Sequence, residues 1–159
     1  MTPRYLILAD GAFGPFTSKT AVGCIRFTPE QVVAVLDTVN AGRTVQDVLG
    51  FGGDIPVVAS VAEGLTLQPN VLLIGIAPAG GRLPEAWRPV LRAALDSGLH
   101  VWSGLHVFIG DDPSSRCEGT CRSWTCGSRR PTCPSRRAVC VMWMPRSSSP
   151  SAAIATSAR

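Results

Sequence analysis

Short apolar runs alternate with amphipathic or turn-rich segments along the first two thirds of the chain. Each run has the length of a buried strand, and its continuous apolarity indicates that both of its faces are covered. Five strands are predicted, at Tyr5–Ala9, Val32–Leu36, Ile55–Ala59, Val71–Ala77 and His100–Trp102, with Val107–Ile109 as a further short candidate. The run Val71–Ala77 is the most apolar of them, so we expect it in the centre of a sheet.

Helical segments are predicted between these strands, at Lys19–Cys24, Thr44–Leu49 and Ser60–Leu65, and from Pro84 to just before Gly98. In the last of these, Trp87, Leu91 and Leu95 recur at the spacing of a helix that covers a sheet face, and Pro84 is placed like a first-turn proline. Parallel neighbours need crossover connections. The predicted fold class is therefore α/β: a Rossmann-like, doubly wound, mostly parallel five-stranded sheet.

In such sheets ligands bind outside the carboxyl ends of the strands, so the loops that follow the strands form the candidate site. The first loop and the helix start after it supply six candidates for binding phosphate or carboxylate: Asp10, Gly11, Gly14, Ser18, Lys19 and Thr20. Glycines let backbone amides approach an anion, and a helix N-terminus favours negative charge. The spacing matches neither G-x-G-x-x-G nor G-x-x-x-x-G-K-[ST], so a plain turn with a solvated lysine is the alternative.

Two further loops add anion-binding candidates. Asp37 ends the second predicted strand, where a dinucleotide fold places an acid against a ribose hydroxyl; Asp37 is equally suited to accept from local backbone amides near Asn40. Gly80 and Gly81 with Arg82 combine exposed amides with a guanidinium, although Arg82 can instead pair with a nearby glutamate.

The loop after the fifth strand contains Ser103 and His106. Ser103 is a binding candidate, and His106 is a weak candidate for a general base, because no partner for it is identifiable in the sequence. His100, at a strand start, is weaker still. The catalytic residues are otherwise left unassigned.

Composition divides the chain near residue 113. Residues 1–113 hold seven Lys and Arg against ten Asp and Glu, whereas residues 114–159 hold eight Arg against the single acid Glu118. We therefore expect a Rossmann-like domain at 1–113 and an Arg-, Ser- and Cys-rich, disordered tail at 114–159. Five of the six cysteines lie in the tail without a C-x-x-C pair, so no metal site is expected. No apolar run is long enough for a membrane span or a secretory signal, which favours a cytoplasmic protein with reduced thiols.

The tail permits two interpretations. Arginines with tryptophans can bind nucleic acid, but Arg, Ser, Pro, Cys and Trp without lysine are also what a GC-rich gene gives in a shifted frame. Joining the third base of each codon to the next two forces V-D-A across Met142–Pro145 and an aspartate at Trp124–Thr125. From Val141 the same rule permits D-V-D-A-A-V-V-L-T-V-G-S-D-C-N-V-G-K, a strand followed by a phosphate-binding loop. The hypothesis is a frameshift near 113–115, with nucleic-acid binding ranked last.

Several segments of residues 5–113 carry a family resemblance: Leu8-Ala9-Asp10-Gly11-Ala12-Phe13-Gly14, Thr17-Ser18-Lys19-Thr20, Thr44-Val45-Gln46-Asp47-Val48-Leu49, Gly52-Gly53-Asp54-Ile55-Pro56, Ile74–Pro84 and Ser103-Gly104-Leu105-His106. This region, about two thirds of the chain, resembles the N-terminal Rossmann-like domain of the domain-of-unknown-function 1611 (DUF1611) family. The hidden D-C-N-V-G-K resembles the P-loop of that family's second domain.

The resemblance implies that the intact parent transfers acetyl from acetyl-CoA to D-glutamate or a related amino acid and binds a nucleotide at its P-loop. It implies that this chain has lost the P-loop domain and is inactive alone, retaining at most a site for an amino acid or nucleotide. A homo-oligomer is left open. The alternative function is that of an NAD-dependent epimerase or oxidoreductase, supported by the fold and Asp37 and opposed by the missing glycine pattern.

Overall fold

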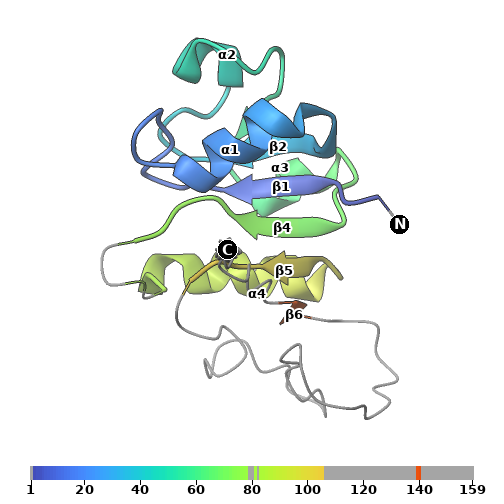
Figure 1. Ribbon diagram of the computed structural model, residues 1–159. Helices are drawn as coiled ribbons and strands as arrows, with labels where there is room; N and C mark the ends of the chain where they lie inside the picture. The colour runs from blue at the N-terminus through green and yellow to red at the C-terminus, as the bar shows by residue number, and fades with distance from the viewer. Residues whose placement is uncertain (1, 79–80, 82, 106–138, 141–159) are drawn as a thin grey trace, which may run out of the picture.

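A computed structural model describes residues 2–78, 81, 83–105 and 139–140 of the 159-residue chain, in which strands and helices alternate (Figure 1). The strands are β1 (Tyr5–Leu8), β2 (Val32–Leu36), β3 (Val57–Val58), β4 (Val71–Ile74), β5 (His100–Trp102) and β6 (Val139–Cys140). The helices are α1 (Lys19–Phe27), α2 (Val45–Leu49), α3 (Val61–Leu65) and α4 (Arg88–Asp96), with 3₁₀ turns η1 (Pro29–Gln31) and η3 (Glu85–Trp87).

The six strands form one sheet in the order β3-β2-β1-β4-β5-β6, and all neighbouring pairs are parallel. This is the strand order of the Rossmann fold, so the predicted α/β class is confirmed. β1 and β4 occupy the centre, as expected for the most apolar run. After β1 the chain continues to β2 on one side, whereas after β4 it continues to β5 on the other side. The direction in which successive strands are added therefore reverses between β1 and β4.

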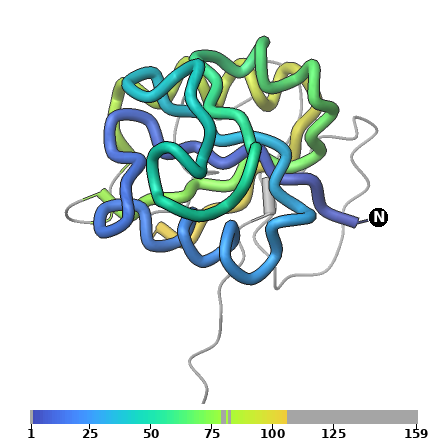
Figure 2. The backbone as a smooth tube through the Cα atoms, turned by 90° about the horizontal axis from the view of Figure 1, so that it is seen from above, coloured from blue at the N-terminus to red at the C-terminus, as the bar shows by residue number. Residues whose placement is uncertain are grey.

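The helices cover both faces of the sheet, as right-handed crossovers require. α1 lies on one face, and α3 and α4, which contact each other, lie on the other (Figure 1). α2 lies beyond the β3 end of the sheet, at the top of Figure 1 and toward the viewer in Figure 2. The connections after β1, β2, β4 and β5 therefore begin at one common edge.

The core consists of the strands and the inner faces of the two longer helices. Leu6, Ile7 and Leu8 of β1 have no exposed surface. Helix α1 buries Ala21 and Ile25, four residues apart, and α4 buries Leu91, Ala94 and Leu95. These spacings place each set on one helix face, which explains why both segments form helices against the sheet.

Helix α1 continues past the predicted Cys24 to Phe27, and three other element boundaries differ from the sequence prediction for identifiable reasons. β3 is limited to Val57–Val58, because Pro56 lacks an N–H and the carbonyl of Ile55 accepts from the N–H of Val45 at 2.8 Å. β4 ends at Ile74, because the carbonyl of Gly75 accepts from α1 instead of continuing the ladder. Pro84 precedes the turn η3, and Pro89 is the proline in the first turn of α4.

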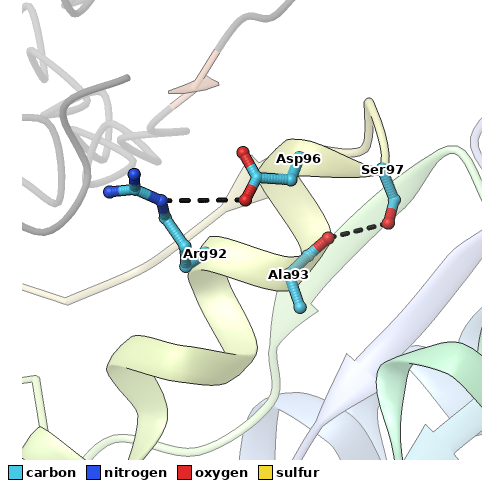
Figure 3. Close-up of polar contacts among 4 residues, drawn as sticks. All are labelled: Arg92, Ala93, Asp96 and Ser97. Atoms are coloured by element: carbon cyan, nitrogen blue, oxygen red, sulfur yellow. Dashed lines mark hydrogen bonds and ion pairs between the residues drawn. The ribbon is translucent and has the colours of Figure 1, made fainter. Parts of the chain in front are cut away.

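Side chains at the C-terminal end of α4 contact one another and the helix backbone. The Ser97 hydroxyl donates to the carbonyl of Ala93 at 2.7 Å, and Arg92 Nε lies 3.7 Å from Asp96 Oδ2 (Figure 3). Gly98 follows with φ +84°, a conformation that favours glycine at a helix end, as the sequence indicated.

Two residues of the Arg-rich tail belong to the described part of the chain. They form β6, which pairs with β5 through Val101 with Val139 and Trp102 with Cys140, a strand that the sequence did not predict. The candidate strand Val107–Ile109 lies outside the described residues. No helix among the described residues has the length and apolar character needed to cross a membrane.

Candidate functional site

The loops after β1 and β2 are joined by a reciprocal pair of aspartate hydrogen bonds. Asp10, just after β1, accepts from the backbone N–H of Thr38 at 2.9 Å and from its hydroxyl at 2.6 Å. Asp37, just after β2, accepts from the backbone N–H of Gly11 at 2.7 Å. Each acid at a strand end thus holds the loop of the neighbouring strand, which fixes two of the loops that border the site.

Both oxygens of the Asp37 carboxylate accept hydrogen bonds from groups of the protein itself. Oδ1 accepts from Gly11, and Oδ2 accepts from the side-chain amide of Asn40 at 2.6 Å. Asn40 in turn accepts from Arg43 at 3.3 Å. Asp37 has 0% exposed surface. Asp37 therefore binds groups of the protein itself, as the second interpretation expected, but its partners are the distant Gly11 amide and the Asn40 side chain rather than local backbone amides.

The loop from Gly11 to Ser18 folds back on itself through Ser18, which has 0% exposed surface. The Ser18 hydroxyl donates to the carbonyl of Gly14 at 2.7 Å and accepts from the N–H of Gly14 at 3.2 Å. The Thr17 hydroxyl donates to the carbonyl of Ala12 at 2.5 Å. The two glycine amides expected to face an anion, those of Gly11 and Gly14, are thus both bonded to side chains of the protein.

Helix α1 begins at this edge and retains two amides that can serve a ligand. The N–H groups of Lys19 and Thr20 have no helical acceptor, as at any helix start, and they donate to no other acceptor in the described part of the chain. Both side chains are exposed. The next amide, of Ala21, donates to the carbonyl of Gly75 at 2.9 Å. The candidates Lys19 and Thr20 therefore present one ammonium group, one hydroxyl and two amides on the site edge.

The backbone after β4 passes unusually close to α1. A Cβ on Gly75 would overlap the Ile7 side chain and lie 2.9 Å from the Cβ of Ala21. Farther along, Gly81 is buried, has φ +65° and donates to the carbonyl of Pro78 at 2.9 Å. Gly80 and Arg82 lie outside the described residues, so only Gly81 of this predicted anion group is placed.

Ser103 follows β5 at the same edge, but its role in the structure is local. It is 2% exposed, and its hydroxyl oxygen accepts from the N–H of Leu105 at 3.1 Å. His106, the weak catalytic candidate, lies outside the described residues. His100 lies at the opposite, amino-terminal end of β5, away from the other candidates.

Topology thus brings Asp10, Asp37 and the α1 start to one edge, as the strand rule predicted. Neither the partners Thr38 and Gly75 nor the Asn40 side chain as a donor was predicted from the sequence. A glycine within an apolar run was an available signal for close backbone approach at Gly75. Among the described residues, no three His, Cys, Asp or Glu side chains gather as a metal site would require.

Comparison with known proteins agrees with this fold. A family described as "Domain of unknown function (DUF1611_N) Rossmann-like domain" matches residues 38–117, half of the chain. The chain belongs to the DUF1611 family. A crystal structure of a DUF1611 family protein from Anabaena variabilis ATCC 29413 superposes with a TM-score of 0.65 at 33% identity, covering 71% of this chain and 32% of that one.

Two proteins similar in sequence to this DUF1611 chain are named D-glutamate N-acetyltransferase. The protein from Tritonibacter scottomollicae is 30% identical over 112 residues, which are 70% of this chain and 31% of the relative. The protein from Pseudoalteromonas sp. is 30% identical over 104 residues, which are 65% of this chain and 29% of the relative. The chain spans about a third of the length of the curated relatives it matches.

Proposed function

We propose that this chain is the N-terminal domain of a protein that resembles D-glutamate N-acetyltransferase. The parent would transfer an acetyl group from acetyl-CoA to the amino group of D-glutamate or a related amino acid. The observation that supports this is the 30% identity over 112 residues with a relative of that name. The family match over residues 38–117 includes the carboxyl ends of β3, β4 and β5, at the edge where ligands of such folds bind.

The reaction needs an amine nucleophile, a base and a clamp for the substrate carboxylates. The amine nitrogen forms a bond to the thioester carbonyl carbon, the carbon–sulfur bond breaks, and the amine proton passes to a base while the thiolate leaves. In the described residues, the group suited to a carboxylate is the start of α1, with the ammonium of Lys19 and the amides of Lys19 and Thr20. We assign this helix start to the acceptor amino acid.

Acetyl-CoA also carries a diphosphate, which is commonly cradled by glycine amides. The described residues do not fit that group well, because Asp37 takes the Gly11 amide and Ser18 takes the Gly14 amide. We therefore propose that acetyl-CoA and any P-loop nucleotide bind the part of the longer relatives that this chain does not match. In this proposal, this domain binds the acceptor amino acid, and the P-loop domain binds the phosphate-bearing ligand.

We further propose that residues after about 113 are read in a shifted frame and that the chain alone is inactive. The shifted reading frame of the tail supports this proposal, because it restores acidic and apolar residues and ends in D-C-N-V-G-K. Val139–Cys140 pair with β5 through backbone groups, and such pairing does not depend on which side chains the frame encodes.

The test begins with sequencing the gene from before the Pro113 codon to well past the stop. The 159-residue chain and the frame-restored protein are then assayed with D-glutamate and acetyl-CoA, and N-acetylglutamate is measured by mass spectrometry. We expect product only from the restored protein. If no second frame continues downstream, the frameshift proposal fails, and if the restored protein makes no product, the acetyl-transfer proposal fails.

A pair of variants of the restored protein tests the acceptor site. Lys19→Ala removes the exposed cation at the site edge and should raise the KM for D-glutamate about tenfold, since one charge-assisted contact contributes on the order of 1.5 kcal/mol. Arg92→Ala removes an exposed cation from α4 and serves as the matched control. Equal KM values for the two variants would show that the acceptor binds elsewhere.

A further inference from the structure

The end of β2 is the position at which a Rossmann dinucleotide site holds the adenosine ribose. There an acid accepts from the ribose hydroxyl, and the glycine-rich turn after β1 lets backbone amides reach the pyrophosphate. This chain has an acid at that position, Asp37, and glycines after β1, which makes dinucleotide binding a natural expectation for its fold. The contacts of these residues contradict that expectation.

Asp37 has no surface to offer a ribose. Its carboxylate is 0% exposed, and its two oxygens accept from the Gly11 amide at 2.7 Å and the Asn40 side chain at 2.6 Å. A carboxylate oxygen has two lone pairs and could accept a second bond, but only from a group that can reach it. With the side chain fully covered, a ribose hydroxyl reaches Asp37 only after one of these bonds breaks.

Three of the amides that would face a pyrophosphate are also engaged, whereas those of Lys19 and Thr20 at the start of α1 are not. Gly11 donates to Asp37, and Gly14 donates to the Ser18 hydroxyl at 3.2 Å. Ala21, in the first turn of α1, donates to the carbonyl of Gly75 at 2.9 Å. Opening the loop would also disturb the reciprocal bonds from Thr38 to Asp10, at 2.9 and 2.6 Å. The closed form of the site edge therefore rests on hydrogen bonds at the ends of both β1 and β2.

We propose that Asp37 is a specificity-determining residue that closes the dinucleotide ribose position by binding Gly11. The domain consequently excludes NAD(H) and NADP(H) from the edge at β1 and β2, and its ligands are anions that bind without an adenosine ribose there. This inference does not depend on the proposed acetyl transfer, because it concerns only how the two loops are joined.

The test uses the full 159-residue chain and two measurements. Calorimetric titration with NAD⁺, and separately with NADP⁺, is expected to give dissociation constants weaker than about 1 mM. Hydrogen exchange followed by NMR is expected to show the Gly11 and Thr38 amides protected to the same order as the amides of β1, although both residues are exposed. A dissociation constant tighter than about 1 mM for either dinucleotide overturns the proposal. Exchange of the Gly11 amide at the rate of an open loop overturns it as well, even where no dinucleotide binds.

Discussion

The backbone N–H of Gly11 donates to Oδ1 of Asp37 at 2.7 Å, across 26 residues of sequence. Gly11 reaches this position with φ +75°, in the left-handed region that favours glycine. The bond connects the ends of two neighbouring parallel strands at the edge where the fold binds ligands. The acid at the end of β2 therefore stabilises the loop after β1, and the shape of the site edge depends on it.

Replacing Asp37 with alanine should lower the free energy of unfolding by about 2–4 kcal/mol. The change removes the acceptor of two part-buried hydrogen bonds, from the Gly11 amide and the Asn40 side chain, and a buried polar group left unpaired costs about 1–3 kcal/mol. Urea unfolding followed by tryptophan fluorescence measures the loss. Asp54→Ala is the control, because Asp54 is exposed and has no bonding partner among the described residues. A similar loss in both variants would contradict the role of Asp37.

The strands could be predicted because burial on both faces leaves a direct signal in the sequence. β2 has the predicted bounds, Val32–Leu36, and all five of its residues are apolar. The same holds for the caps of the short helices: Thr44 accepts from the N–H of Asp47 and Ser60 from the N–H of Glu63, at the residues where the sequence placed these helix starts. Such signals act within a few residues of the chain.

The contacts of the candidate site could not be predicted, because they join residues that only the sheet register brings together. The sequence placed Asp10, Gly11 and Asp37 at one edge, but it did not indicate that Gly11 and Asp37 bind each other. Ser18 was expected to face a ligand, and its hydroxyl instead bonds both polar backbone groups of Gly14. Short polar side chains can serve the backbone or a ligand equally well, so their type alone does not decide between the two.

Gly75→Ala should destabilise the fold, because a Cβ there would overlap Ile7 and lie 2.9 Å from Ala21. Crowding a packed core costs about 1–3 kcal/mol. Gly23→Ala is the matched control: it lies in α1 with nothing within 4 Å of an added Cβ, and alanine should stabilise the helix by about 0.5–1 kcal/mol. Thermal unfolding of both variants measures the difference. A melting temperature of Gly75→Ala at or above that of Gly23→Ala would refute the close packing of β4 on α1.

The start of α2 should contribute stability that is lost in acid. Thr44 and Asp47 bind each other reciprocally, and the backbone and side-chain hydrogen bonds from Thr44 hold the pKa of Asp47 below its ordinary value of 3.8. Because the pKa is lower in the folded than in the unfolded chain, this contribution is complete above pH 3.8 and declines as the pH falls through the folded pKa.

Thr44→Ala should therefore cost about 1 kcal/mol at neutral pH and less in acid. Urea unfolding of the wild type and the variant at pH 7 and below the ordinary Asp47 pKa measures both differences, and subtraction cancels the titration of the other carboxylates. Thr20→Ala, at an exposed threonine in the first turn of α1, is the control and should show no such pH dependence. A cost for Thr44→Ala that stays constant across this range would mean that the Asp47 charge is not part of the cap.

Cys24 should react more slowly with alkylating reagents than an exposed cysteine. It lies in α1 and is half-buried against the core, and this burial raises the pKa of its thiol above the usual value. The thiolate is the reactive form, so a raised pKa leaves less of it at any pH below that value. Peptide mapping after timed treatment with iodoacetamide follows Cys24 separately from the other five cysteines. The rate at Cys24 should reach its half-maximum at a higher pH in the folded chain than in the same chain in urea. Coincident pH profiles in the two states would show that the α1 face carrying Cys24 is not packed against the sheet.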